Sequence, residues 1–600
     1  MCGICGEVRF DDQAINEKVI KAMLSKLERR GPDAEGSWIK PQVGFAHRRL
    51  SVIDLSDDSN QPMVDEELQL SLVFNGAIYN YPELRAQFIK EGYNFKSHGD
   101  TEVILKAYHK WGEQCPEYLH GMFAFAIWDW KKQSLFLARD RMGIKPLYYS
   151  LTNNKIRFAS NMQALLASNK IDSDIDTTIN PVGLHNQFTL HAVIPAPNTI
   201  LNGIQKLEPG TTLTLEKNKE PKTKRYWQLD ATRLAMDSLE ADMSEEEWTE
   251  AIHDSLRTAV RKRLDVADVP VGVLLSGGLD SSLLVGLLDE AGASDIRTFS
   301  IGFDDQPEEK GNEFEFSDAV VKRYNTQHQK IIIPDSDVLK RLPEAVQAMS
   351  EPMVGQDAVA FYLLSEQVSK HVKVVQSGQG ADEVFAGYFW FPRIHEDNAT
   401  ENVERFAKYY FDRDHAEYLE TVSDDYKGED YTSKIIEDLL ARPNASEFID
   451  RVLHMDVNTL VVDDPVKRVD NMTMAFGLEA RVPFLDHYLV ELAAKMPPAM
   501  KLQSGGKHVL KKIARGIVPD AVIDRPKAYF PVPALKYVRD DFLDFMQDIL
   551  NSSACINRGV FNRAYVAKLL KQPDEYFTRL QGSKVWHLAL LEYWLQTHVD

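Results

Sequence analysis

Cysteine is scarce in this sequence: its 600 residues include only Cys2, Cys5, Cys115 and Cys555. A scaffold of disulfide bonds at this size would need many more, which argues against a disulfide-stabilised secreted protein. Long apolar runs are also missing, since the longest candidate, from Val271 to Leu288, is interrupted by Asp280. No basic segment followed by an apolar one marks a signal peptide. We therefore expect a soluble protein of the reducing cytoplasm, without a membrane partner.

An excess of positive charge is absent as well. Lys and Arg number 69 against 90 Asp and Glu, which gives a formal net charge of −21. This balance argues against nucleic acid or an anionic membrane as a partner. The 44% of hydrophobic residues can form ample cores, and the length indicates two to four domains. The composition is that of a globular cytoplasmic enzyme.

Two common nucleotide-binding glycine motifs are also absent. Gly506-Lys507 is followed by His508 and lacks the spacing of a Walker A loop. The segment Gly378-Gln379-Gly380-Ala381-Asp382-Glu383 ends in Glu, where a dinucleotide-binding motif has Gly. If the protein uses a nucleotide, another loop must bind it.

The segment from Val269 to Leu288 predicts such a loop. Its β-branched start is typical of a buried strand, Ser276-Gly277-Gly278 breaks the strand, and an apolar helix follows. Glycine lets the backbone approach a ligand closely, and the free N–H groups of a helix N-terminus attract anions. The alternative is that these glycines only turn the chain between a strand and a helix.

Two acidic residues predict a cation beside the bound anion. Asp280 would repel a phosphate unless an ion such as Mg²⁺ lay between them. Residues 372–383 repeat the order of strand, glycine turn and acid, so that Asp382 gives the ion a second carboxylate. The alternative for Asp382 is capping of a helix N-terminus.

The N-terminus carries a candidate nucleophile. Met1 precedes a small residue and is expected to be removed, which leaves Cys2 with a free α-amino group. That amine, with a reference pKa of about 7.7–8.0, can act as the base for its own thiol. The alternative is a redox or metal-binding pair of Cys2 and Cys5, although no second CxxC completes a zinc site.

Residues downstream supply what a cysteine needs to attack an amide. Asn75-Gly76 offers a side-chain amide and a backbone N–H as oxyanion donors. Arg49 can bind the carboxylate of a free amino acid, and Asp100 can bind its ammonium group. Taken singly, Asn75-Gly76 would be a hairpin turn, and Arg49 and Asp100 would be surface charges.

Together these residues resemble the class II glutamine amidotransferase domain, which hydrolyses glutamine to glutamate and ammonia. The resemblance implies an N-terminal-nucleophile fold, an αββα sandwich of two antiparallel sheets between helices, in which Cys2, Asn75 and Gly76 are catalytic. It implies that L-glutamine is bound by Arg49, Leu50, Ser51, Val52, Ile53, Asn75, Gly76, Ala77 and Asp100. The family commonly has Glu where this chain has Ala77, so one side-chain contact to glutamine is lost.

The later part of the chain resembles the synthetase domain of asparagine synthetases. Ser276-Gly277-Gly278-Leu279-Asp280-Ser281 is similar to the pyrophosphate loop of ATP pyrophosphatases, and residues 479–486 and 525–527 match further family segments. The resemblance implies an α/β fold with a doubly wound parallel sheet, ATP and Mg²⁺ as cofactors, and Glu351 and Lys527 as catalytic residues. It implies Asp280 and Asp382 as metal ligands and, for ATP, contacts from Leu274, Ser276, Gly277, Gly278, Asp280, Ser281, Ile301, Ser377 and Gly378. The resemblance is also compatible with a homodimer.

A shift in composition separates the two parts. Residues 216–248 are rich in charge and poor in core residues, which predicts a linker between a glutaminase domain at 2–215 and a synthetase domain at 249–600. Ser244 and Glu247 have the spacing of a capping box for the helix that follows.

The resemblance implies adenylation of a carboxylate, followed by its amidation with ammonia from glutamine. Asparagine synthetases carry an arginine soon after their catalytic Glu, whereas here Glu351 is followed by Pro352-Met353-Val354-Gly355-Gln356-Asp357. With Ser377-Gly378-Gln379-Gly380, this segment resembles N-acetylglutaminylglutamine amidotransferases, which amidate an osmoprotectant dipeptide. We expect a small peptide carboxylate as acceptor, with L-aspartate as the alternative. A synthetase with an inactive glutaminase and a non-catalytic scaffold are alternatives of other classes, which the intact Cys2 and Asp280 argue against.

Overall fold

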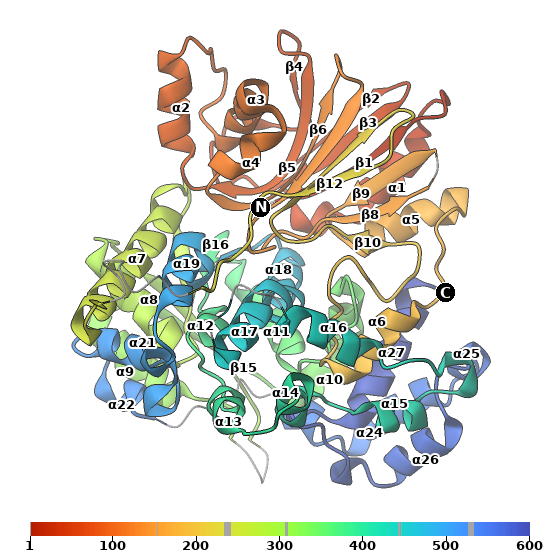
Figure 1. The fold of residues 1–600 in the computed structure, drawn as a ribbon, viewed down its shortest axis with the longest axis vertical. Coiled ribbons are helices and arrows are strands. Elements are labelled where there is room, and N and C mark those ends of the chain that lie inside the picture. The colour runs from red at the N-terminus through yellow and green to blue at the C-terminus, as the bar shows by residue number, and fades with distance from the viewer. Residues whose placement is uncertain are drawn as a thin grey trace.

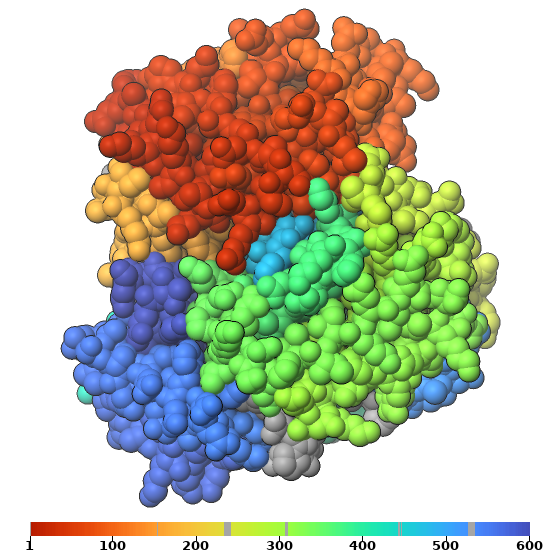
Figure 2. All heavy atoms as spheres, turned by 180° about the vertical axis from the view of Figure 1, so that it is seen from behind, coloured from red at the N-terminus to blue at the C-terminus, as the bar shows by residue number. Residues whose placement is uncertain are grey.

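The structure is a computed structural model that describes residues 2–152, 154–232, 242–305, 310–441, 445, 447–525 and 533–600. It has two halves (Figure 1): antiparallel strands with flanking helices form the N-terminal half, and helices around a parallel sheet form the C-terminal half. Seen from behind, the N-terminal half rests on the C-terminal half along a broad boundary (Figure 2). None of the helices among these residues combines the length and the apolarity that a membrane span requires.

Two six-stranded antiparallel sheets form the centre of the N-terminal half. The first has the order β10-β8-β9-β1-β3-β2, with β1 (Gly3–Arg9), β2 (Ala34–Lys40), β3 (Val43–Arg49), β8 (Tyr148–Leu151), β9 (Lys155–Ala159) and β10 (Gln205–Lys206). The second has the order β12-β11-β7-β6-β5-β4, with β4 (Met63–Asp65), β5 (Leu70–Ile78), β6 (Gly121–Asp129), β7 (Ser134–Arg139), β11 (Thr211–Glu216) and β12 (Lys222–Arg225).

The two sheets pack face to face and helices cover their outer faces. Ile4 and Phe45 of the first sheet share one buried cluster with Val73 and Leu137 of the second. Helices α1 (Glu17–Ser25) and α5 (Met162–Asp172) cover the first sheet, and α2 (Tyr81–Lys90) and α3 (Asp100–Trp111) cover the second. The predicted αββα sandwich is confirmed, and it places residue 2 directly before a central strand.

Part of the predicted linker is a strand. Residues 222–225 form β12, which pairs with Thr211–Thr214 of β11, so the N-terminal sheet continues past residue 215. Residues 233–241 of the linker lie outside the described part. The capping box is confirmed at the start of α7 (Glu245–Asp265): Ser244 Oγ accepts from Glu247 N, and Glu247 Oε2 accepts from Ser244 N at 2.7 Å.

The C-terminal half contains a five-stranded sheet of order β15-β14-β13-β16-β17, in which every pair is parallel. The strands are β13 (Val271–Leu274), β14 (Arg297–Phe303), β15 (Gln327–Ile333), β16 (Val374–Gln376) and β17 (Glu479–Arg481). One face packs against α7, α8 (Leu279–Glu290), α9 (Phe314–Tyr324) and α21 (His508–Ala514), and the other against α10 (Asp335–Ala348), α11 (Asp357–Val368) and α18 (Lys467–Met474). The doubly wound parallel sheet is confirmed. Its strand order reverses between β13 and β16, where sheets of this kind bind ligands.

Further helices pack around this sheet. They include α6 (Pro181–Thr189), α12 (Ala381–Val384), α13 (Trp390–Glu396), α14 (Asn402–Tyr410), α15 (His415–Thr421), α16 (Tyr431–Leu440), α17 (Phe448–Met455), α24 (Asp540–Leu550), α26 (Arg563–Lys571) and α27 (Lys584–His598). The last of them, α27, is buried along most of its length.

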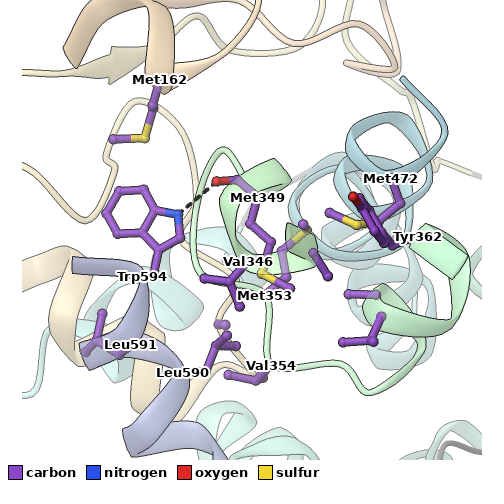
Figure 3. Packing of buried hydrophobic residues seen from close by; sticks show 14 of the residues in the cluster. Met162, Val346, Met349, Met353, Val354, Tyr362, Met472, Leu590, Leu591 and Trp594 are labelled. Carbon is purple, nitrogen blue, oxygen red and sulfur yellow. Dashed lines mark hydrogen bonds between the residues drawn. The ribbon is translucent and has the colours of Figure 1, made fainter. Parts of the chain in front are cut away.

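Helix α27 fixes the segment that contains Glu351. Trp594 Nε1 donates to the carbonyl oxygen of Met349 at 2.8 Å (Figure 3), and Trp586 Nε1 donates to that of Val354 at 2.9 Å. The two indoles therefore hold both ends of residues 349–354. Met162 of α5 lies beside the Trp594 ring, so this core also joins the two halves of the chain.

We expect Trp594→Phe to destabilise the protein. The change keeps an aromatic ring but removes one of two side-chain donors to the carbonyl oxygen of Met349, where Gln163 Nε2 remains at 2.9 Å. The lost hydrogen bond is worth about 0.5–1.5 kcal/mol. Thermal unfolding measured by calorimetry should show a lower transition temperature than for Trp111→Phe, a control at a partly exposed ring. Equal transition temperatures for the two variants would contradict the anchoring role of this hydrogen bond.

Candidate active sites

Cys2 is the centre of the first candidate site. Its backbone N–H donates to Asn75 Oδ1 at 3.0 Å, and Arg30 Nε donates to its carbonyl oxygen at 3.2 Å. The Nδ2 group of Asn75 is buried and has no hydrogen-bond partner among the described residues. A buried N–H group without a partner, on a residue in contact with a cysteine, suits the stabilisation of an oxyanion.

Gly76 continues β5 in a conformation that excludes a side chain. Its φ is +155°, and a Cβ atom would lie 2.1 Å from the carbonyl oxygen of Met122. The next residue, Ala77, is fully buried and offers no polar group. Because β5 is held between β4 and β6, Asn75 and Gly76 occupy fixed positions in a strand rather than a hairpin turn.

The thiol of Cys2 requires activation. Burial raises its pKa, while the backbone of Leu50 and the guanidinium of Arg49 act in the opposite direction. Since the thiolate is the reactive form, a base must take the proton. The α-amino group freed by removal of Met1 is the predicted base, and Met1 lies outside the described residues.

Hydrogen bonds hold Arg49 and Asp100, the two residues predicted to bind the charged groups of glutamine, in place. Arg49 Nη1 donates to the carbonyl oxygen of Ser56 at 2.7 Å and to Asn60 Oδ1 at 2.8 Å. Asp100 begins α3 and its Oδ2 accepts from the N–H of Ile78 at 3.0 Å, just beyond Ala77 in the chain. Burial raises the pKa of Asp100 to about 6, so its carboxyl group titrates near the lower end of the physiological range.

The remaining predicted glutamine-binding residues follow β3 and dock onto the other half. Leu50 and Val52 are buried, Ile53 is partly buried, and the N–H of Ser51 donates to Asp33 Oδ2 at 2.7 Å. The carbonyl oxygen of Val52 accepts from the N–H of Asp268 at 2.9 Å, shortly before β13. No motif in the sequence predicts this connection between the two halves.

The second candidate site is a cavity of about 1150 Å³ at the carboxyl ends of β13 and β16. Of the predicted ATP-binding residues, those that line it are Leu274, Ser276, Gly278, Asp280, Ser281, Ile301, Ser377 and Gly378. Gly277 has a φ of +75° and turns the loop without lining the cavity. Pockets for single small ligands measure about 300–1,000 Å³, so this cavity has room for a nucleotide and a second substrate.

Asp280 and Asp382 converge on one point although they lie in the first turns of different helices, α8 and α12. Lys507 Nζ lies 2.6 Å from Asp280 Oδ2 and 2.8 Å from Asp382 Oδ1. Although burial opposes the charged form, the two carboxylates raise the pKa of Lys507. A point that holds an ammonium between two carboxylates fits the charge and the oxygen donors that Mg²⁺ requires. Sequence reasoning missed Lys507, because it was examined only as part of a Walker A loop.

Glu351 lies in the wall between the two sites. It is fully buried, 3.1 Å from Lys206 Nζ, and it accepts a hydrogen bond from Tyr148 Oη at 3.0 Å. Lys206 and Tyr148 belong to β10 and β8 of the N-terminal half. Glu351 does not line the large cavity, but Val354 does. The other predicted catalytic residue of this half, Lys527, lies outside the described residues.

A second buried ion-pair cluster joins the halves next to Cys2. Asp470 Oδ2 is 2.9 Å from Arg30 Nη1, and Asp470 Oδ1 is 3.2 Å from Lys145 Nζ. Arg30 is the residue that donates to the carbonyl oxygen of Cys2. Charged side chains from both halves therefore join the halves beside Cys2.

Comparison with known proteins agrees with this arrangement. The family described as asparagine synthase matches residues 251–596, and the glutamine amidotransferase domain matches residues 1–227. The chain belongs to the asparagine synthase family.

Members of the asparagine synthase family are similar to this chain over its whole length. It is 31% identical over 641 residues to asparagine synthetase [glutamine-hydrolyzing] 1 of Bacillus subtilis, with 100% of this chain and 97% of the relative covered. Asparagine synthetase [glutamine-hydrolyzing] 3 of the same organism is 29% identical over 636 residues, with 100% and 99% covered. Amidase chyE of Penicillium rubens is 27% identical over 624 residues, with 89% of each chain covered. This asparagine synthase family member is a carbon–nitrogen ligase that uses glutamine as its amide donor.

We expect the KM for glutamine of this asparagine synthase family member to rise as the pH falls through about 6, the pKa of Asp100. Protonation removes the negative charge that attracts the substrate ammonium group, and the loss approaches tenfold per pH unit below the pKa. Glutamate release measured between pH 5 and 8 gives the KM. Asp100→Asn is the control, because it should show a high KM with no step near pH 6. A flat wild-type profile would remove Asp100 from glutamine recognition.

Proposed function

We propose that this enzyme adenylates the carboxylate of a small peptide, N-acetylglutaminylglutamine, and amidates it with ammonia released from L-glutamine. A glutaminase domain ending near the linker would supply the ammonia, and the synthetase domain, from residue 249 onward, would use it. The cavity volume supports this proposal, because a nucleotide and an extended acceptor need more room than a nucleotide and a free amino acid.

In the proposed glutaminase reaction, Cys2 Sγ attacks the amide carbon of glutamine. The α-amino group of Cys2 takes the thiol proton and returns it to the leaving ammonia, which leaves a glutamyl thioester on Sγ. Water then attacks the thioester carbon, the C–S bond breaks, glutamate is released and the thiol regains its proton. Asn75 Nδ2 and the backbone N–H of Gly76 stabilise the oxyanion. Arg49 and Asp100 hold the carboxylate and ammonium groups of the substrate, and residues 50–53 and 77 form the surface around them.

In the proposed synthetase reaction, the loop 276–281 and residues 377–378 hold the phosphates of ATP. Asp280 and Asp382 would hold Mg²⁺, which neutralises phosphate charge when bound. Lys507 already has its ammonium at the same point, so it is suited to contact phosphate oxygens once a metal ion takes the carboxylates. Lys527 is proposed to stabilise charge on the transferred groups, and Glu351 to accept a proton from ammonia.

The environment of Asp357 is the observation that carries the choice of acceptor. Its Oδ2 lies 2.9 Å from Arg468 Nη2, and Arg468 is also bound to Asp464. This one guanidinium is thus engaged by two carboxylates at the wall of the cavity. A cavity with this surplus of acid disfavours the second carboxylate of L-aspartate and favours an acceptor with neutral side chains.

Aromatic residues on the same wall suit the stems and amide groups of a peptide. The rings of Tyr388 and Trp390 stack with centroids 4.2 Å apart, and both residues line the cavity. The faces of aromatic rings bind the apolar methylene chains of a peptide's side chains, while the Tyr hydroxyl and the Trp N–H at the ring edges can bind amide groups. L-Aspartate as acceptor is the second candidate. It is favoured by the names of the two Bacillus subtilis relatives, which are asparagine synthetases.

The deciding experiment measures pyrophosphate release with ATP, Mg²⁺ and glutamine against a panel of acceptors. We expect N-acetylglutaminylglutamine to stimulate release at least about tenfold more than L-aspartate, a difference of about 1.4 kcal/mol in transition-state binding. Cys2→Ala is the matched control: it should lose amidation with glutamine and keep it with ammonium salts. Equal stimulation by L-aspartate would overturn the peptide proposal, and loss of both activities in Cys2→Ala would overturn the division of labour.

We expect Asp280→Asn and Asp382→Asn each to lower pyrophosphate release by at least about a hundredfold, the scale of losing one electrostatic contact in the transition state. Glutamate release without acceptor should continue, because Cys2 and its partners are unchanged. Titration of each variant with Mg²⁺ at fixed ATP measures the effect on metal dependence. Turnover with the wild-type Mg²⁺ dependence in either variant would remove that residue from the metal site.

A further inference from the structure

A cluster of metal-ligand side chains lies outside both sites, where α6, α15 and α16 meet. His185 Nε2 lies 3.0 Å from His415 Nδ1 and 3.8 Å from Asp430 Oδ1. These three ligand atoms all lie within 4.8 Å of one another. Helices α6 and α16 are neighbours in the fold (Figure 1), so the cluster connects segments that are more than two hundred residues apart in the chain.

We propose that His185, His415 and Asp430 bind a divalent transition-metal ion of the zinc class. In a tetrahedral zinc site, with bonds of about 2.0–2.2 Å, neighbouring ligand atoms lie about 3.3 Å apart. The two measured separations fall on either side of that value. Two imidazoles and one carboxylate form a borderline-soft donor set that suits Zn²⁺ and not Mg²⁺.

The orientation of His185 supports this site independently of the spacing. Thr432 Oγ1 donates to Asn186 Oδ1 at 2.8 Å, so its lone pair is available to His185 Nδ1 at 2.6 Å. This arrangement places the imidazole proton on Nδ1 and leaves the lone pair of Nε2 directed at the cluster. Metal-binding histidines are typically oriented by such a hydrogen bond to the second nitrogen.

The surroundings also permit coordination. His185 is fully buried, so on this side the ion would be held against the protein interior. His415 and Asp430 are partly exposed, which leaves an entry path and space for water as a fourth ligand. By contrast, the cluster of His191, Asp412 and His587 has Arg413 and Lys584 nearby, which disfavour a cation.

A bound ion would fasten α6 to the helical region around α15 and α16. Helix α6 ends at Thr189, and His191 just beyond it lines the large cavity. The ion would thus support one wall of the cavity from outside, without contact to the nucleotide loop. Its role would be structural, and activity would depend on it only through the stability of that wall.

The test separates a metal site from simple helix capping. Asp430 Oδ1 also caps α16 by accepting from the N–H of Ser433 at 3.0 Å. Asn caps a helix as well as Asp does, so Asp430→Asn keeps the cap and removes the charged ligand. Thr432→Val keeps all three ligands and removes the group that orients His185. His371→Gln, at an exposed histidine elsewhere, is the matched control.

Full-length protein, stripped with chelator and dialysed, is titrated with Zn²⁺ against a chromophoric chelator, and the metal content of untreated protein is measured by mass spectrometry. We expect about one zinc ion per chain in the wild type and in His371→Gln. Thr432→Val should bind Zn²⁺ about 10–100-fold more weakly than the wild type, the scale of losing a hydrogen bond that orients a metal ligand. Asp430→Asn should bind Zn²⁺ at least as weakly as Thr432→Val. At a Co²⁺ concentration just sufficient for the wild type, the visible absorption of a tetrahedral site should be strong in the wild type and in His371→Gln and weak in Thr432→Val and Asp430→Asn.

Unfolding temperatures of the metal-free proteins show whether each variant is folded, so a loss of binding cannot be mistaken for a loss of structure. Added Zn²⁺ should raise the unfolding temperature of the wild type and of His371→Gln, and much less that of Asp430→Asn. Absence of stoichiometric zinc in the wild type, or equal affinity in all four proteins, would overturn the proposal. Neither result depends on the identity of the acceptor.

Discussion

The carboxylate of Asp470 is the contact on which the two-site arrangement depends. It is buried on α18 between Arg30 and Lys145, both of which belong to the N-terminal half. Removing one partner of a buried ion pair leaves an uncompensated charge and costs about 3–5 kcal/mol. Since Arg30 also donates to the carbonyl oxygen of Cys2, one carboxylate fixes both the contact between the halves and the position of the proposed nucleophile.

Local motifs made the individual sites predictable. Ser276–Ser281 and residues 377–378 are short segments whose shape follows from their own glycines, and all of these residues except Gly277 line one cavity. Asn75 and Gly76 were expected as neighbours of Cys2, and the hydrogen bond from Cys2 to Asn75 agrees with that expectation. The spacing of these residues in the sequence is enough to identify them, because a loop of six residues determines its own backbone conformation.

The residues that make contacts between distant parts of the chain do not belong to any local sequence motif that would identify them. Lys206 and Tyr148 are single residues far in the chain from their partner Glu351, and only the packing of the halves brings them together. Lys507 is also far in the chain from Asp280 and Asp382, and the fold of the C-terminal half brings these three together. The strand β12 was overlooked for another reason. Its residues Lys222–Arg225 are charged and largely exposed at the edge of a sheet, where charge prevents pairing with other chains. Composition alone makes such an edge strand look like a linker.

The C-terminal helix shows why uninformative sequence can still be essential to a site. Helix α27 carries no catalytic motif, yet Trp586 and Trp594 fasten both ends of the segment that contains Glu351. Glu351 in turn contacts Lys206 and Tyr148, so its position is determined jointly by the last helix and by strands of the N-terminal half. A carboxylate placed in this way cannot shift toward either site without breaking contacts to both halves. This arrangement suits the role proposed for Glu351, which is to accept a proton from ammonia as it attacks the activated carboxylate.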